Sequence, residues 1–274
     1  MTRLIVAIDG PSGAGKGTVA RTISKTLGYR HIDTGAMYRA VAWKALQEGI
    51  PLGDEARVAE LARRAAIVVE GGAVRIDGHD VTSAIRTPEI DKASSAVARL
   101  PGVREVLVAR QRELGKGGGV VMEGRDIGTV VWPDARLKVF LDARPDVRAA
   151  RRSAEQGSAH AVGPEVHERD RRDASRPVGT MQPASDAVLL DTTSLDAEET
   201  AQRILGLLQP GRRDLLYTFV RGVLALILRV VVRLDVRGRE NIPDRGPVIL
   251  APNHRSLIDI PVAGVVTKRH VAFM

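Results

Sequence analysis

The sequence comprises 274 residues, enough for one large domain or for a domain and a half. With 44% apolar and 27% charged residues, its composition is ordinary for a globular protein. It contains no cysteine, which excludes disulfides, thiolate metal sites and thiol catalysis and suits a reducing cytoplasm. The formal net charge is +8, but residues 210–274 hold eleven Arg or Lys against five Asp or Glu, so the basic excess gives no reason to expect nucleic-acid binding by the N-terminal part.

The first expected element is a strand that leads into a glycine-rich loop. An apolar run at 4–8 precedes the loop, and a helix-like segment at 19–27 follows it. The loop reads Gly10-Pro11-Ser12-Gly13-Ala14-Gly15-Lys16-Gly17-Thr18. Its glycines allow backbone N–H groups to surround a phosphate, the helix adds its positive end, and Lys16 adds a mobile charge. We therefore expect a phosphate-binding loop.

Two positions at this loop deserve separate interpretation. Gly17 follows Lys16 where Ser or Thr is usual, and a hydroxyl comes only at Thr18, a variant that resembles the small nucleoside monophosphate kinases. Asp9 directly precedes the loop. Two roles are open for Asp9: it orients water around magnesium, or it caps the turn.

Further strand-like runs at 119–122, 137–141 and 188–190 alternate with helical patterns that include 34–48 and 197–208. Alternating strands and helices predict a parallel sheet covered on both faces. Residues 67–77 differ, because two short apolar runs flank Gly71-Gly72 and a second turn follows at Asp77-Gly78. This pattern predicts a β-hairpin in a small insertion that stands off the main sheet.

Residues 144–176 are rich in arginine. The arginines are Arg144, Arg148, Arg151, Arg152, Arg169, Arg171, Arg172 and Arg176. Guanidinium groups suit phosphate oxygens, and transfer between two nucleotides requires mainly positioning and neutralisation, since a phosphate nucleophile is already largely deprotonated at neutral pH. A solvated helix with internal salt bridges is the alternative, because acidic residues alternate with these arginines. The same acids and the lack of aromatic residues argue against nucleic acid as a partner.

Three motifs carry a resemblance to a known family. They are Asp33-Thr34-Gly35-Ala36-Met37-Tyr38-Arg39, residues 123–129 and residues 168–176. With the loop, they make residues 1–209 similar to bacterial cytidylate kinase (CMP/dCMP kinase). The resemblance implies an α/β P-loop nucleoside monophosphate kinase fold, with a parallel sheet flanked by helices. It also implies a small β-containing insertion that binds the monophosphate, roughly 34–100, and an arginine-rich lid, roughly 144–177.

The resemblance also implies roles for individual residues. The ATP-binding residues are those of the loop, Gly10, Pro11, Ser12, Gly13, Ala14, Gly15, Lys16, Gly17 and Thr18. The CMP-binding residues are Thr34, Tyr38, Arg39, Ser95, Arg104, Arg125, Asp126, Arg169, Asp173 and Arg176. The catalytic residues are Lys16, Arg125, Arg151, Arg152 and Arg176. Magnesium is expected with ATP, without direct protein ligation.

Within the CMP-binding set, the chemistry of the side chains supports separate tasks. Ser95, Arg104 and Asp126 would read the edge of cytosine, because a carboxylate accepts from the exocyclic amine that uracil lacks. Arg39, Arg125 and Arg176 would hold the CMP phosphate, and Arg169 and Asp173 would reach the ribose. Arg169, Asp173 and Arg176 are spaced i, i+4 and i+7, which places them on one helix face.

A boundary follows residue 209, and residues 210–235 are expected to form a linker and an apolar helix. Within 215–234 the basic residues are Arg221, Arg229 and Arg233, which fall within an arc of about 120° on a helix. Each would cost roughly 2.5–3.5 kcal/mol at the centre of a membrane span, so a span is disfavoured. A helix on the inner membrane surface and a helix that docks on a further domain are both open.

The last segment, 236–274, resembles the beginning of a 1-acylglycerol-3-phosphate acyltransferase. It contains Asn253-His254 followed by Asp259, and in that family the histidine acts as a base on a hydroxyl while the aspartate orients it. We expect this segment to be truncated and inactive as present. In a longer protein it would belong to a bifunctional kinase and lysophospholipid acyltransferase.

The function expected from the sequence is therefore ATP-dependent phosphorylation of CMP and dCMP to CDP and dCDP, in the cytoplasm and in possible peripheral contact with the membrane through 215–234. The alternative from a different class is a nucleotide-binding module without catalysis, tethered to the membrane. Turnover distinguishes the two.

Overall fold

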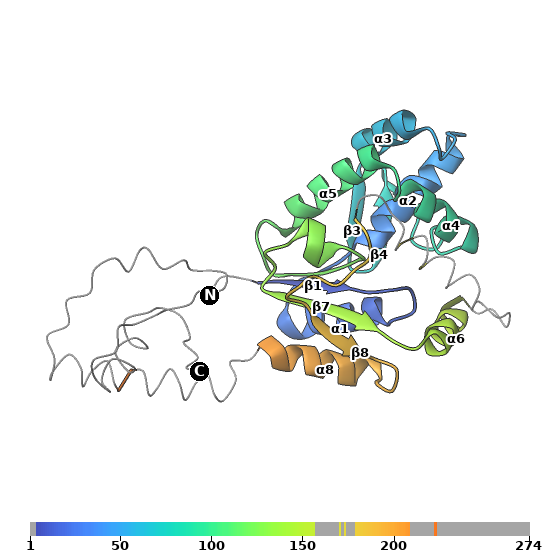
Figure 1. The fold of residues 1–274 in the computed structure, drawn as a ribbon. Coiled ribbons are helices and arrows are strands. Elements are labelled where there is room, and N and C mark those ends of the chain that lie inside the picture. The colour runs from blue at the N-terminus through green and yellow to red at the C-terminus, as the bar shows by residue number, and fades with distance from the viewer. Residues whose placement is uncertain (1–3, 157–169, 171–172, 174–178, 209–221, 224–274) are drawn as a thin grey trace, which may run out of the picture. The chain divides into compact units, whose positions relative to one another are not determined.

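The computed structural model describes residues 4–156, 170, 173, 179–208 and 222–223 (Figure 1). The chain forms two compact units, Met1–Leu208 and Gln209–Met274. All the elements named below belong to the first unit. In the described part of the chain, no helix has both the length and the apolar character needed to cross a membrane.

The first unit is built on a five-stranded parallel sheet in the order β2-β6-β1-β7-β8. Its strands are β1 (Ile5–Asp9), β2 (Arg30–Asp33), β6 (Val120–Glu123), β7 (Leu137–Asp142) and β8 (Val188–Asp191). The predicted strands and the parallel sheet are confirmed. Strand β2 was not predicted, because it lies at the sheet edge and Ile32 is its single fully buried residue.

Helices cover both faces of this sheet (Figure 1). On one face, Val6 and Ile8 of β1 pack against α1 (Lys16–Leu27) and α8 (Ala197–Leu208). On the other face, Ala7 packs with α5 (Pro101–Gly115) and the π-helix η1 (Ile127–Val131). Because successive strand residues point to opposite faces, burial on both sides explains the continuous apolar runs in the sequence.

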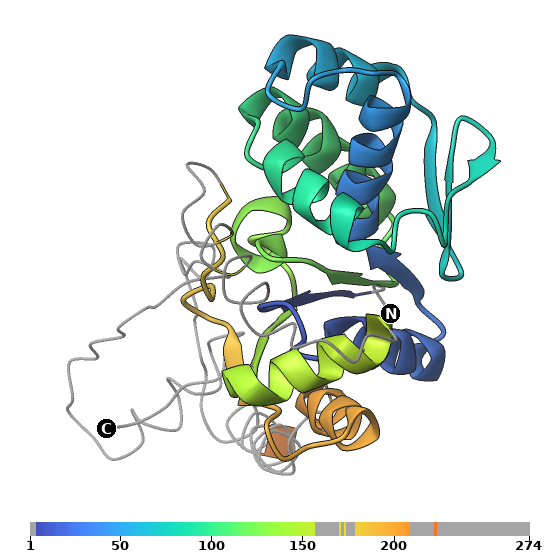
Figure 2. The same ribbon diagram turned by 90° about the vertical axis from the view of Figure 1, so that its right-hand side faces the viewer.

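An insertion between β2 and β6 forms a second core. It contains α2 (Thr34–Gln47), α3 (Glu55–Arg64), α4 (Pro88–Val97) and most of α5, which meet around Met37, Leu61 and Leu107. Strands β3 (Ile67–Glu70), β4 (Ala73–Ile76) and β5 (His79–Asp80) form an antiparallel sheet of three strands. This sheet stands apart from the main one (Figure 2), as predicted.

The turns of this small sheet depend on left-handed backbone conformations. Gly71 and Gly72 join β3 to β4 with φ values of +58° and +87°, and Asp77 and Gly78 join β4 to β5 with φ values of +48° and +81°. Glycine adopts such conformations without a steric penalty, and aspartate is one of the few other residues that tolerate them. The two predicted turns are therefore confirmed.

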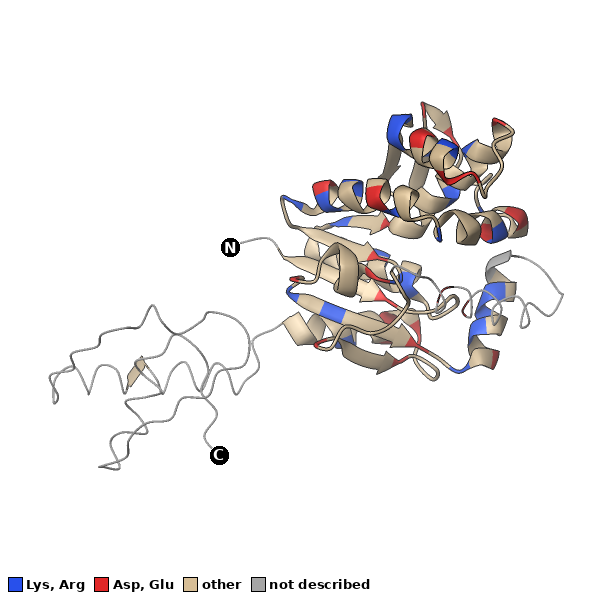
Figure 3. Ribbon diagram, turned by 45° about the horizontal axis from the view of Figure 1, so that its top comes forward, with Lys and Arg blue, Asp and Glu red and all other residues tan. Residues whose placement is uncertain are grey.

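The arginine-rich region begins with α6 (Pro145–Gln156), which carries basic residues along its length (Figure 3). Of the predicted lid at 144–177, the structure describes residues 144–156, Asp170 and Asp173. Arg169 and Arg176 lie outside the described residues. So do the predicted apolar helix at 215–234, apart from residues 222–223, and His254 and Asp259 of the C-terminal motif.

Candidate functional site

The phosphate loop connects β1 to α1 at the carboxyl edge of the parallel sheet. Gly13 and Gly15 have φ values of +78° and +88°, which explains why glycine stands at both positions. Lys16 is the first residue of α1, and its Nζ donates to the carbonyl oxygen of Pro11 at 2.7 Å. The loop therefore holds its lysine close to its own backbone, next to the positive end of a helix.

A cavity of about 410 Å³ opens between this loop, the insertion and the end of β6. Its walls contain most of the residues predicted from the sequence. Those on the ATP side are Ser12, Gly13, Gly15, Lys16, Gly17 and Thr18. Those on the CMP side are Thr34, Tyr38, Arg39, Ser95, Arg125, Asp126 and Asp173, and Arg152 also faces the cavity. Residues that are far apart in the sequence thus share one site.

Of the three side chains predicted to read cytosine, Ser95 and Asp126 line this cavity, and Arg104 is buried beside Asp126. Arg104 forms an ion pair with Asp126, and its Nη1 also donates to Tyr38 Oη at 3.4 Å. Ser95 is only 3% exposed, although a helical serine is commonly a surface residue. Among the described residues, Ser95 Oγ and Arg104 Nε have no hydrogen-bond partner. Buried polar atoms without partners are costly, and Ser95 lines the cavity, so its hydroxyl is a candidate partner for a polar ligand.

The three predicted arginines that line the cavity are each paired with an aspartate. Arg125 Nε contacts Asp173 Oδ2 at 2.9 Å, and Asp173 is only 1% exposed. Arg39 Nε contacts Asp91 Oδ1 at 3.0 Å, and Arg152 pairs with the other oxygen of Asp91. These contacts hold the guanidinium groups in place from several elements: α2, α4, α6 and the segment after β6.

Asp9 lies at the end of β1 and is almost completely buried. Its two oxygens accept the backbone N–H groups of Ile127 and Gly128, both at 2.8 Å. Burial raises the pKa of the Asp9 carboxyl to about 6, although these two hydrogen bonds act in the opposite direction. Asp9 therefore caps the first turn of η1, rather than its own loop, and ties the phosphate loop to the segment that carries Arg125 and Asp126.

Glu123 is a cavity residue that the sequence did not single out. Its carboxylate would lie 3.3 Å from a Cβ placed on Gly17, so the glycine allows this acidic side chain to lie close to the loop. His31 Nε2 contacts Glu123 Oε1 at 2.8 Å, and Thr34 Oγ1 donates to the Glu123 carbonyl oxygen at 2.7 Å. An acidic residue at the carboxyl end of a buried strand was the signal that could have identified it.

Arg151 faces a second cavity, of about 420 Å³, on the other side of the phosphate loop. It donates to the carbonyl oxygens of Thr192 and Leu195 at 2.7 and 3.1 Å and to Thr192 Oγ1 at 3.0 Å. Gly15, Thr18 and Ala197 line the same cavity. In this structure Arg151 thus holds the loop between β8 and α8, a segment that the sequence analysis did not connect with the site.

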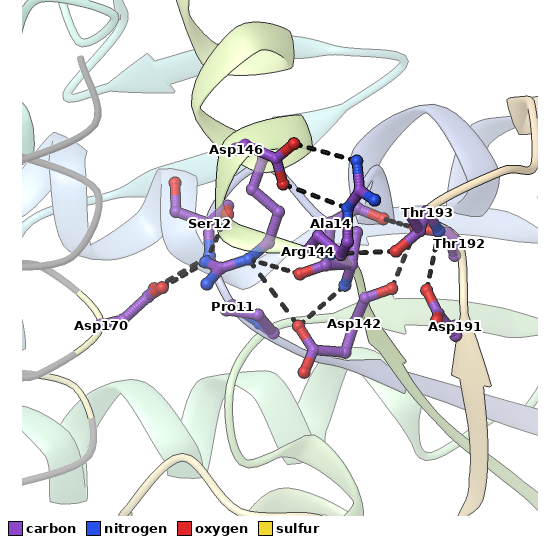
Figure 4. Close-up of polar contacts among 12 residues, drawn as sticks. Pro11, Ser12, Ala14, Asp142, Arg144, Asp146, Asp170, Asp191, Thr192 and Thr193 are labelled. Carbon is purple, nitrogen blue, oxygen red and sulfur yellow. Dashed lines mark hydrogen bonds and ion pairs between the residues drawn. The ribbon is translucent and has the colours of Figure 1, made fainter. Parts of the chain in front are cut away.

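Asp170, in the predicted lid, also contacts the phosphate loop (Figure 4). Its Oδ1 accepts from Ser12 N at 3.3 Å, and its Oδ2 pairs with Arg148. Arg148 donates to the carbonyl oxygens of Ser12 and Ala143 at 3.2 and 3.0 Å. A carboxylate therefore accepts a loop N–H of the kind that binds phosphate in such loops.

Comparison with known proteins agrees with this geometry. Residues 6–210 match the family model described as cytidylate kinase. A cytidylate kinase of Pelotomaculum thermopropionicum is 49% identical over 220 residues, which are 76% of this chain and 97% of that protein. A cytidylate kinase of Solibacter usitatus is 48% identical over 211 residues, which are 74% of this chain and 91% of that protein.

Three further similarities concern a fused relative, a solved structure and the C-terminal segment. A bifunctional pantoate ligase/cytidylate kinase of a Synechococcus strain is 45% identical over 216 residues, and the match covers 40% of that protein. Shikimate kinase from Acinetobacter baumannii, solved with shikimate, has 16% identity and a TM-score of 0.42 over 76% of this chain and 93% of that chain. Residues 233–274 match the family model described as acyltransferase, in agreement with the resemblance of the C-terminal segment.

Proposed function

The chain belongs to the cytidylate kinase family and phosphorylates CMP and dCMP with ATP, and we propose that the cavity between the phosphate loop and the insertion holds the two reacting nucleotides. The observation that carries this proposal is that Ser95 and Asp126, two buried polar residues, line the same cavity as Lys16 and Thr18 of the loop. In this proposal, residues 34–100 bind the monophosphate and residues 144–177 form the lid.

Cytosine would be read by its exocyclic amine. The Asp126 carboxylate can only accept hydrogen bonds when ionised, and Arg104 can only donate. Cytosine presents an N4 amino donor beside its ring N3 and O2 acceptors, so it complements this pair. Uracil would place its O4 acceptor against the Asp126 carboxylate, so neither of these two oxygens would receive a hydrogen bond from the other. This arrangement strongly disfavours UMP.

The phosphates would be held by the cationic side chains around the loop. Lys16 and the N-terminus of α1 support binding of the ATP phosphates, and Arg39 and Arg125 support binding of the CMP phosphate. The CMP phosphate is already largely ionised at neutral pH, because its second pKa is about 6, so no general base is needed. The proposed role of the protein is to align the nucleophile and neutralise the charge that the two nucleotides bring together.

Magnesium would be held mainly by the ATP phosphates, with Thr18 and Glu123 beside them. The two residues fit this role, because a carboxylate and a hydroxyl are hard oxygen donors and both face the cavity next to Gly17. When bound, the metal would neutralise part of the negative charge of the phosphates. Among the described residues, no group of three or more His, Asp or Glu could form a dedicated metal site.

The direct test is ADP production by the purified chain with ATP, Mg²⁺ and CMP, dCMP, UMP or AMP in turn. We expect turnover with the two cytidine nucleotides and rates with UMP and AMP that are lower by about a hundredfold or more. Binding of ATP and CMP by calorimetry without any ADP formation would support the alternative of a nucleotide-binding module without catalysis.

A further inference from the structure

Asp91 joins two arginines of the site that come from different parts of the fold. It lies in the first turn of α4, where a negative charge is favoured by the helix N-terminus. Its Oδ1 contacts Arg39 Nε of α2 at 3.0 Å, and its Oδ2 contacts Arg152 Nη2 of α6. The side chains of Arg39, Arg152 and Asp91 are only 10%, 12% and 13% exposed, so all three are held in a largely water-free cluster.

The position of the carboxylate relative to the cavity decides what it can do. Arg39 and Arg152 both line the cavity, whereas Asp91 is not among the residues that line it. The carboxylate thus lies behind the two guanidinium groups rather than between them and a ligand. Arg39 uses its Nε for this contact, and a planar guanidinium held through Nε can present its two terminal nitrogens to a second anion.

We propose that Asp91 is a positioning residue that holds Arg39 and Arg152 as a pair facing the phosphates of the reacting nucleotides. This inference rests on the proposed function of the cavity. Two guanidinium groups that share one carboxylate keep a net positive charge, which attracts a phosphate, while the shared carboxylate reduces their mutual repulsion. Asp91 also links α4 of the insertion to α6, so the arginine from each part is set by the same group.

The position of Asp91 also sets the sign of its effect. A carboxylate that competed with phosphate would weaken CMP binding, and its removal would strengthen binding. A carboxylate behind the arginines orients them, and its removal lets two long side chains move and repel each other. We therefore expect loss of Asp91 to weaken the use of CMP.

The experiment compares steady-state kinetics of the wild-type chain with Asp91→Asn and Asp91→Ala, in Mg²⁺ and with each nucleotide varied in turn. We expect kcat/KM for CMP to fall about tenfold or more, since charge-assisted hydrogen bonds to two arginines are lost, while KM for ATP stays within about twofold. Glu89→Gln is the matched control, because Glu89 is an exposed acid in the same first turn of α4, and we expect it to behave as wild type.

A double-mutant cycle with Arg39→Lys tests whether Asp91 acts through Arg39. Lysine keeps the charge but lacks the fork, so Asp91→Asn should cost much less in that background than in the wild type. CMP binding by calorimetry and thermal unfolding of each variant separate loss of affinity from loss of folding. If Asp91→Asn and Asp91→Ala both lower thermal stability, the cycle is measured below the unfolding temperature of every variant, where it still shows whether Asp91 acts through Arg39.

Three results would overturn the inference. They are tighter CMP binding by Asp91→Asn, equal losses for CMP and ATP, and effects of Asp91 and Arg39 that simply add. A wild-type chain that forms no ADP from CMP would instead contradict the proposed function itself. An active wild type with unchanged Asp91 variants would contradict only the role of Asp91.

Discussion

Three aspartates near the cavity have different surroundings, and these surroundings set different tasks. Asp126 pairs with a buried arginine, Asp9 accepts two backbone N–H groups, and Asp91 lies behind two arginines. A carboxylate beside a guanidinium forms an ion pair and can also accept from a ligand, whereas one buried among amides is disfavoured as an anion. The residue type alone therefore does not say which of them contacts substrate.

Asp126→Ala tests the base-reading role. The variant should lower kcat/KM for CMP by about a hundredfold, because removal of a charged hydrogen-bonding partner costs roughly 1–3 kcal/mol and Arg104 loses its counter-ion. KM for ATP should change by less than about twofold, since ATP is held at the phosphate loop. Steady-state kinetics with each nucleotide varied separately provide the check. Equal losses for CMP and ATP would count against a role in base reading.

The buried carboxyl of Asp9 predicts how the stability of the fold depends on pH. Its pKa is about 6 in the fold, whereas an unfolded aspartate titrates near pH 3.9, so the folded chain binds this proton more tightly. The stability due to this proton is fully present below about pH 4 and is lost as the pH rises through 6. This difference in the pKa of Asp9 between the folded and the unfolded chain corresponds to at most about 3 kcal/mol of unfolding free energy.

Asp9→Asn removes this titration, and urea unfolding of both chains between pH 4 and 7 measures it. The free energy of unfolding of the wild type should fall relative to that of Asp9→Asn across this range by up to about 3 kcal/mol. Taking the difference between the two chains cancels the other acids, whose lowered pKa values act in the opposite direction. Parallel curves for the two chains would show that Asp9 titrates normally.

At the scale of elements, the loop between β8 and α8 shows how one arginine shapes the ATP side. Arg151 donates to two carbonyl oxygens of this loop, and the second cavity lies between them and the phosphate loop. Backbone carbonyls that share one guanidinium fix the distance between α6 and the loop. We expect this second cavity to influence the use of ATP rather than of CMP.

Arg151→Met tests that expectation. The side chain keeps its length but loses its hydrogen bonds, so KM for ATP should rise about tenfold while KM for CMP stays within about twofold. Arg144→Met is the control, because the Arg144 side chain is 66% exposed and pairs only with Asp146 among the described residues. A fall in kcat without a change in KM for ATP would indicate instead that Arg151 reaches the transferred phosphoryl group.

Gly179, which follows the predicted lid, lies against Arg104 and Asp126, the pair proposed to read the base. Its φ is +69°, and a Cβ there would overlap the Arg104 guanidinium and the Asp126 carboxylate. Gly179→Ala should therefore lower kcat/KM for CMP by at least about tenfold, in addition to the roughly 1 kcal/mol of backbone strain that a left-handed alanine carries.

The control for Gly179→Ala is Gly49→Ala. Gly49 has a φ of +63°, but nothing lies within 4 Å of its added Cβ, so it carries the same backbone strain without the overlap. Kinetics and thermal unfolding of both variants separate the two effects. Equal kinetic changes in the two variants would show that strain, not contact with Arg104 and Asp126, is responsible.

At the scale of the whole molecule, the sequence predicted what depends on local pattern. The glycine loop, the apolar strands and the hairpin turns at Gly71 and Asp77 each carry their signal in a few adjacent residues. Strand β2 was not predicted, because this edge strand has a single buried position. The aspartate partners of the arginines were not predicted either, because an ion pair such as Arg39–Asp91 joins residues 52 apart in the sequence. Side-chain partners of that kind are set by packing of the two cores, which no local pattern encodes.

The second unit carries the last prediction, which concerns the apolar stretch at 215–234. If this stretch lies on an anionic membrane surface, each of Arg221, Arg229 and Arg233 should contribute about 1 kcal/mol of attraction. The chain should then sediment with vesicles that contain phosphatidylglycerol and bind those of pure phosphatidylcholine more weakly. Replacing the three arginines with glutamine should weaken binding to the anionic vesicles by roughly a hundredfold.

A matched control separates local from general charge in this vesicle experiment. Arg57, Arg75 and Arg99 are exposed residues of the first unit, and their replacement with glutamine changes the net charge by the same amount. This control should bind anionic vesicles as the wild type does, because electrostatic attraction fades within a Debye length of about 10 Å and only the stretch at the surface contributes. If both triple variants bind anionic vesicles equally weakly, the net charge of the chain, rather than the stretch at 215–234, is responsible for the attraction. No binding by the wild type would favour a helix that docks on a further domain, so the same sedimentation assay decides between the two roles that the sequence leaves open.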